Sequence, residues 1–96
     1  MTSVRLTIRN PSGLHARPAA TFVRTAGRFR SSIQVRNLTA DRPAADAKSI
    51  LGVMTLGVEA GHEVEITADG DDAELAIAGL REAVEAGLGE SVEPAP

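Results

Sequence analysis

The chain has 96 residues, no cysteine and a formal net charge of -3 at pH 7. This length suits one small domain with a single core and little room for a deep substrate pocket. The lack of cysteine excludes disulfides, zinc–thiolate sites and thiol nucleophiles. The only aromatic residues are two phenylalanines, and no basic field is present, so the composition also argues against nucleic-acid binding.

No segment has the length and apolar purity of a membrane span. The N-terminal residues alternate between apolar and polar from Val4 onward, which is not the pattern of a signal peptide. We therefore expect a cytoplasmic protein without membrane insertion. No glycine-rich phosphate loop is present, and two histidines among scattered acidic residues do not form a metal motif, so we expect neither a cofactor nor a metal.

The first half of the chain predicts a strand, a helix and a second strand. Val4, Leu6 and Ile8 alternate with polar residues, as in a half-buried strand. A Pro-Ser-Gly loop follows, and residues 16–26 then place apolar side chains at helical spacing. We expect this helix to stop near Gly27. The second strand is marked by Ile33 and Val35.

The second half begins with an ambiguous segment, residues 37–47, in which Pro43 favours an edge strand or a loop over a central strand. Residues 49–56 predict a short, very apolar helix. Residues 63–68 predict a strand.

We expect the last helix to begin near Asp71, which forms the acidic version of a capping box with Glu74. Residues 90–96 carry two prolines and no periodicity, and we expect a flexible tail there, after a domain of residues 1–89. Helices with a single apolar stripe need one sheet face to cover. The order of elements therefore predicts an α+β fold with an antiparallel sheet and all its helices on one side.

His15 stands where the loop gives way to the first predicted helix. Gly13 frees the backbone before this helix, and Pro18 fixes its first turn. A helix start presents unpaired N–H groups and a positive dipole end, which together bind anions. A neutral imidazole at such a site can attack phosphorus and hold the phosphoryl group. On the residues alone, a solvated or merely capping histidine remains the alternative.

Arg17 follows two residues later and supplies a fork of donors suited to phosphate oxygens. The positive helix end disfavours the charged imidazolium by roughly 0.3–1 kcal/mol at an exposed site, which keeps the ring nucleophilic. We expect the backbone N–H groups of Ala16 and Arg17 to bind the phosphoryl oxygens.

The first helix carries a positive face opposite its apolar stripe. It is formed by Arg17, Ala20, Thr21, Arg24 and Arg28. This face is either an ordinary solvated surface or a docking surface for acidic partners.

The short helix is too apolar to bury every side chain against one sheet. Ser49 is a good N-cap residue for it. We expect Val53 and Leu56 to face the core, and Ile50, Leu51 and Met54 to stay partly outside. An exposed apolar patch of this kind is typical of a partner site, although burial under a neighbouring loop is the alternative.

Two runs of the sequence, residues 10–20 and 48–56, closely resemble the HPr family, the histidine-containing phosphocarriers of the phosphoenolpyruvate-dependent sugar phosphotransferase system. The resemblance covers residues 4–89, nearly the whole chain. Its most specific parts are the runs Gly13-Leu14-His15-Ala16-Arg17-Pro18-Ala19 and Lys48-Ser49-Ile50. The family implies an open-faced β-sandwich, in which three helices cover one face of a four-stranded antiparallel sheet in the order βαββαβα.

The resemblance also implies a role and partners. Enzyme I would pass a phosphoryl group to Nδ1 of His15, and enzyme IIA components would collect it, so the chain would be a carrier rather than an enzyme with its own turnover. Arg17 would stabilise the phosphoryl group. Docking would use a face made by Ala16, Arg17, Ala20, Arg24, Ile50, Leu51 and Met54. We expect a monomer, since a carrier must meet two successive partners.

Ser49 matches the serine that a dedicated HPr kinase phosphorylates in some members, where a transcriptional regulator is a further partner. A phosphate there would put about two negative charges into the docking face. The alternative is that Ser49 only caps its helix. A regulatory module, or a relay in a nitrogen-related or dihydroxyacetone kinase branch, also remains open. The segment 37–47 is longer and richer in Pro and Asp than the family's third strand and turn.

Overall fold

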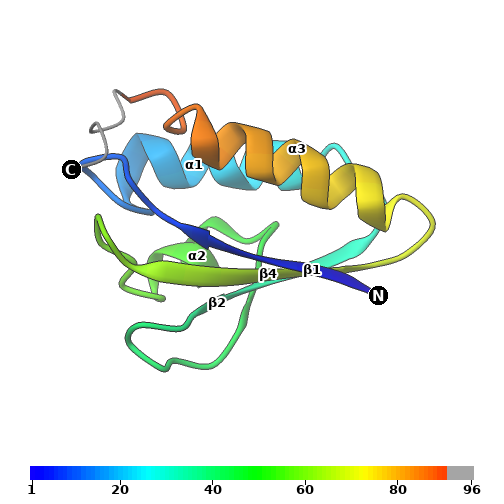
Figure 1. The fold of residues 1–96 in the computed structure, drawn as a ribbon, viewed down its shortest axis with the longest axis horizontal. Coiled ribbons are helices and arrows are strands. Elements are labelled where there is room, and N and C mark those ends of the chain that lie inside the picture. Colours follow the sequence, from blue (N-terminus) through cyan, green and yellow to red (C-terminus); the bar gives the residue numbers. More distant parts are fainter. Residues whose placement is uncertain (91–96) are drawn as a thin grey trace.

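The computed structural model describes residues 1–90, which form four strands and three helices in the predicted order (Figure 1). The elements are β1 (Thr2–Thr7), α1 (Ala16–Ala26), β2 (Ser32–Asn37), β3 (Ala45–Asp46), α2 (Ile50–Met54), β4 (Glu63–Asp69) and α3 (Ala73–Glu85).

The strands form a single antiparallel sheet in the order β1-β4-β2-β3. β4 is central and pairs with β1 on one side and β2 on the other, so Ile66 lies between Val4 and Val35. These three side chains face the helices. Arg5 and Glu65, the next pair along the strands, form an ion pair on the opposite, open face of the sheet. The alternation seen in the sequence is thus the alternation between the two faces of the sheet.

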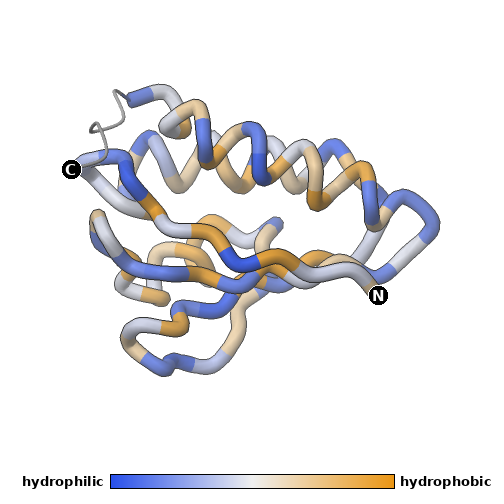
Figure 2. Tube along the Cα trace, in the orientation of Figure 1, coloured by the Kyte–Doolittle hydropathy of each residue, from blue (hydrophilic) through white to orange (hydrophobic). Residues whose placement is uncertain are grey.

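The helices lie on one side of this sheet, with α1 and α3 packed against each other (Figure 1). Figure 2 shows hydrophobic and hydrophilic residues alternating along α3, and the buried ones are Ala73, Ala76, Ile77, Leu80 and Val84. Phe22 of α1, Val53 of α2 and Leu80 of α3 are fully buried in one cluster with Ile66 of β4. The fold is the predicted α+β open-faced sandwich, because each helix buries one stripe against the same sheet face.

The ambiguous segment 37–47 contains a turn, a loop with Pro43 and the two-residue strand β3 at the sheet edge. Asn37 at the end of β2 organises this loop, since its buried side chain accepts a hydrogen bond from the backbone of Ala40. It also donates to the carbonyl oxygen of Leu56. The expectation of an edge strand or a loop is confirmed, because both are present.

The N-terminus of α3 differs from our expectation. Its N-cap is Asp72 rather than Asp71, and the Asp72 side chain does not cap its own helix. The carboxylate instead accepts hydrogen bonds from the backbone of Arg30 and from the backbone and hydroxyl of Ser31. The capping box predicted for Asp71 and Glu74 is therefore wrong: the N-cap is the next residue, Asp72, and its carboxylate is bonded to the loop before β2.

Glu90, which we expected to begin the tail, packs instead against the loop between β1 and α1. Figure 1 shows the end of the described chain beside that loop. The rest of the expected tail, residues 91–96, lies outside the described residues. Among residues 1–90, no helix is long and apolar enough to cross a membrane.

Candidate functional site

Two loops from distant parts of the sequence meet at His15. The backbone N–H of Leu14 donates to the carbonyl oxygen of Val58 at 3.0 Å. This approach requires glycine at position 13, since its φ is +60° and a Cβ there would overlap the Val58 carbonyl. The glycine expected to free the backbone before the helix therefore also brings the loop of residues 58–59 against it.

His15 is the N-cap residue of α1 and has extended backbone dihedrals. Within residues 1–90, the backbone N–H groups of Ala16 and Arg17 have no hydrogen-bond acceptor. Ala16 has a φ of +50°, a left-handed conformation that costs a non-glycine residue about 1–2 kcal/mol. Both Ala16 and Arg17 are exposed. The arrangement offers free donors to an anion next to the imidazole.

The His15 ring makes one contact with an acidic side chain. Its Nε2 lies 3.2 Å from Oε1 of Glu59, and both side chains are partly exposed, at 36% and 62%. No hydrogen bond to Nδ1 is formed within the described part of the chain. A carboxylate accepts hydrogen bonds, so this contact favours the tautomer with the proton on Nε2 and the lone pair on Nδ1.

The backbone of Glu59 is held by a second histidine. The N–H of Glu59 donates to Nδ1 of His62 at 3.2 Å, and the N–H of His62 donates to the carbonyl oxygen of Glu59 at 3.0 Å. Asn37 donates from its amide to the same Nδ1 at 3.3 Å. His62 is thus half-buried and helps to fix the loop that carries Glu59.

Glu90 ties the end of the domain to the loop before His15. Its carboxylate accepts hydrogen bonds from the Asn10 side chain at 3.0 Å, and from the Ser12 backbone at 3.0 Å and hydroxyl at 2.8 Å. The pKa of Glu90 lies below its usual value, mainly because of the Asn10 hydrogen bond. The two Ser12 bonds lower this pKa further, burial opposes them, and the Arg17 charge contributes least.

Asn10 is fully buried and also donates to the carbonyl oxygen of Gly13 at 2.9 Å. Its amide therefore connects Glu90 with the turn that precedes His15.

An apolar patch lies on α2, which packs against α1. Val53 and Leu56 are buried, whereas Leu51 is 75% exposed, and Ile50 and Met54 are each 39% exposed. The expected division of this helix between core and surface is confirmed.

The positive face of α1 is shorter than expected. Arg17 and Arg24 are exposed and Ala20 is half-buried, but the helix ends at Ala26, and Arg28 follows its C-cap.

Ser49 is the N-cap of α2, as predicted. Its hydroxyl oxygen accepts a hydrogen bond from the backbone N–H of Gly52 at 3.1 Å. The side chain is half-buried and stands at the edge of the α2 patch.

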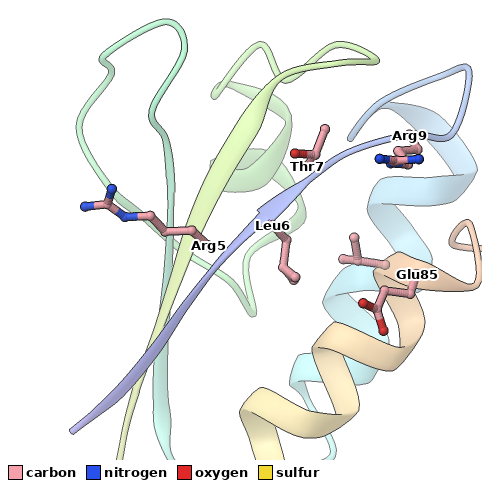
Figure 3. A pocket seen from close by; sticks show the side chains of 6 residues that line it. Arg5, Leu6, Thr7, Arg9 and Glu85 are labelled. Atoms are coloured by element: carbon pink, nitrogen blue, oxygen red, sulfur yellow. The ribbon is translucent and has the colours of Figure 1, made fainter. Parts of the chain in front are cut away.

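A hollow of about 450 Å³ lies away from His15, between the end of α3 and the edge strand β1. Figure 3 shows its lining, in which Arg5 extends to the other side of β1 from Glu85. The charged side chains do not converge on one point, as they would around a ligand. The lining of this hollow therefore gives no indication of a ligand site.

The sequence predicted that His15 and Arg17 lie together at the start of a helix, but it did not predict the contacts of Glu59 and Glu90. Glu59 lies 44 residues after His15, and Glu90 lies 78 residues after Ser12. Neither residue belongs to a local motif, so only the tertiary fold reveals these contacts.

The chain matches the family model "PTS HPr component phosphorylation site" over residues 2–86. It is 44% identical to the multiphosphoryl transfer protein of Haemophilus influenzae over 90 residues, which are 94% of this chain and 18% of that protein. It is 48% identical to the Vibrio cholerae protein of the same name over 83 residues, or 86% and 21% of the two chains. The chain thus spans about a fifth of the length of these curated relatives.

The fold is similar to solved structures as well. The crystal structure of HPr-C-His from Thermoanaerobacter tengcongensis has a TM-score of 0.89 and 47% identity, covering 96% of this chain and all of that one. The crystal structure of the phosphocarrier protein HPr from Bacillus anthracis has a TM-score of 0.80 and 38% identity, covering 86% and 95% of the two chains. The chain therefore belongs to the HPr family, the phosphocarriers of the phosphotransferase system.

Proposed function

We propose that His15 is the residue that carries the phosphoryl group and that Nδ1 is the atom that bonds to phosphorus. The supporting observation is the position of His15 as the N-cap of α1, beside two backbone N–H groups that lack acceptors within residues 1–90. Those N–H groups and the Arg17 guanidinium would bind the oxygens of the incoming group.

The proposed donor is enzyme I and the proposed acceptors are enzyme IIA components, with the chain acting as a relay without its own turnover. Docking would use the exposed residues of α1 and α2 around His15. The members of this face are Ala16, Arg17, Ala20, Arg24, Ile50, Leu51 and Met54. An apolar patch next to arginines suits a partner surface with an apolar centre and an acidic rim.

Ser49 is a proposed regulatory phosphorylation site. Phosphate there would stand beside the exposed α2 patch, so it would oppose docking to an acidic surface. Incubation with an HPr serine kinase and ATP should label Ser49 and not Ser49→Ala. Absence of label on the intact chain would leave Ser49 with its capping role only.

The test of the main proposal is incubation with enzyme I and labelled phosphoenolpyruvate. We expect one acid-labile, base-stable phosphate, located by peptide mapping on the fragment that contains His15. His15→Ala, checked for folding by circular dichroism, should remain unlabelled. Equal labelling of His15→Ala, or mapping of the phosphate to His62, would refute the assignment.

A further inference from the structure

We propose that Glu59 is a positioning residue for His15: its carboxylate holds the proton on Nε2, orients Nδ1 toward the phosphoryl donor, and offsets the charge that the ring acquires on phosphorylation. This inference rests on the proposed function of His15. It adds to His15 and Arg17 a further residue, one that belongs to no local motif around the histidine.

The first argument is the contact itself. Glu59 Oε1 lies 3.2 Å from Nε2, which is hydrogen-bond distance, and it is the one carboxylate among residues 1–90 that pairs with the ring. An imidazole whose Nε2–H is engaged in this way presents Nδ1 as its lone pair. The Glu59 contact therefore selects the same nitrogen that the proposed phosphoryl transfer needs.

The second argument is that Glu59 is held in place. An isolated surface ion pair is weak, because two mobile side chains must be ordered and water screens their charges. Here both backbone polar groups of Glu59 bond to His62, and the preceding residue, Val58, accepts a hydrogen bond from Leu14 next to His15. The two bonds to His62 fix the turn that carries Glu59, and the bond from Leu14 to Val58 joins this turn to the residue before His15.

The third argument concerns charge during transfer. The Nδ1 lone pair forms a bond to phosphorus, while the bond between phosphorus and the donor atom of enzyme I breaks and its electron pair leaves with that donor. The His15 ring keeps its Nε2 proton and becomes positively charged. A carboxylate beside Nε2–H stabilises such an imidazolium, as the aspartate of a serine protease triad does. The phosphoryl oxygens at Nδ1 lie on the other side of the ring from this carboxylate.

Two substitutions separate the hydrogen bond of the Glu59 side chain from its negative charge. Glu59→Gln retains an oxygen that can accept from Nε2–H but removes the charge, and Glu59→Ala removes both. Glu82→Ala is the matched control, since it removes an exposed carboxylate from α3.

The first measurement needs no phosphorylation. Long-range proton–nitrogen NMR spectra are recorded in alkaline solution, where an imidazole ring is neutral. We expect the intact chain and Glu59→Gln to show a protonated Nε2 and an unprotonated Nδ1. In Glu59→Ala the two nitrogen signals should move toward each other as the tautomers mix. Identical His15 signals in the intact chain and Glu59→Ala would overturn the proposal.

The second measurement is the steady-state rate of phosphorylation by enzyme I, with this protein as the varied substrate. Loss of one hydrogen bond of this kind predicts a kcat about three- to tenfold lower for Glu59→Ala, with Glu59→Gln in between, and an unchanged KM. Glu82→Ala should match the intact chain. An unchanged kcat, or an effect confined to KM, would show that Glu59 is not a positioning residue.

The two proposals fail in different ways. If the intact chain takes no phosphate on His15, the proposed function fails, whereas the tautomer measurement still reports whether Glu59 orients the ring. If the intact chain is phosphorylated normally and Glu59→Ala behaves like Glu82→Ala, the proposed function stands and the role of Glu59 is refuted.

Discussion

Gly13 determines how closely the His15 loop and the Glu59 loop approach each other. Its positive φ and the absence of a Cβ allow the Leu14 N–H to reach the Val58 carbonyl. Gly61 also has a positive φ, of +90°, but a Cβ there would meet nothing within 4 Å. Comparing an alanine substitution at each of the two glycines therefore separates the effect of backbone strain from the effect of a steric clash.

We expect Gly13→Ala to lower the free energy of unfolding by more than about 2 kcal/mol, since strain of about 1–2 kcal/mol adds to the clash with the Val58 carbonyl. Gly61→Ala should lower the free energy of unfolding only by the backbone strain of about 1–2 kcal/mol. Urea unfolding of both variants measures the difference. The Gly13 argument fails if the two variants lose the same stability.

At the same scale, the sequence predicted His15 and Arg17 as a pair because the relevant signals are local: a glycine before the helix, a proline in its first turn and an arginine two residues on. Glu59 gives no such signal, since its contact to His15 depends on the loop geometry between α2 and β4. Residues that act through local helix geometry are predictable, and residues brought in by tertiary packing are not.

At the scale of elements, α2 shows how a short helix divides between core and surface. The spacing of its apolar residues predicted which would be buried, because a helix of five residues can turn only one side to the sheet. The N-terminus of α3 was predicted less well. Asp71 and Asp72 are adjacent and equally good caps by type, and the choice depends on the hydrogen bonds that Ser31 and Arg30 offer to Asp72.

The exposed apolar patch of α2 leads to a prediction about docking. Leu51→Ser should leave the free energy of unfolding within about 0.5 kcal/mol of the intact chain, because the side chain is 75% exposed. If Leu51 is an anchor of the enzyme I interface, KM for enzyme I should rise about tenfold, equivalent to about 1.4 kcal/mol.

Leu75 on α3 offers a matched control, since it is 68% exposed and lies outside the proposed docking face. Leu75→Ser should leave both stability and KM unchanged. An equal rise in KM for the two variants would mean that general surface hydrophobicity, and not the α2 patch, governs the encounter.

At the scale of the whole molecule, two carboxylates join parts of the chain that are far apart in sequence. Asp72 connects the start of α3 to the loop before β2, and its pKa is lowered, chiefly by the Ser31 hydroxyl and then by the Arg30 backbone N–H. Glu90 connects the last described residues to the loop before His15. Both carboxylates hold the fold in their ionised form, so protonation at low pH weakens the two connections together.

This linkage predicts the acid stability of the molecule. Because the folded-state pKa of Glu90 is lowered, its contribution is fully present above the unfolded value of about 4.3 and is lost as the pH falls through the lower folded value. Glu90→Gln should therefore show a shallower fall in the free energy of unfolding between about pH 5 and pH 3 than the intact chain, measured by urea unfolding at each pH.

The effect of Glu90 should be separable from that of Asp72, because the two carboxylates share no hydrogen-bond partner. Adding Asp72→Asn to Glu90→Gln should flatten the acid profile by a further, additive amount. Glu82→Gln removes an exposed carboxylate of α3. Its free energy of unfolding should fall with pH as steeply as that of the intact chain. If that of Glu90→Gln also fell as steeply, the hydrogen bonds from Asn10 and Ser12 would contribute nothing to stability, and the connection between Glu90 and the His15 loop would not hold the fold.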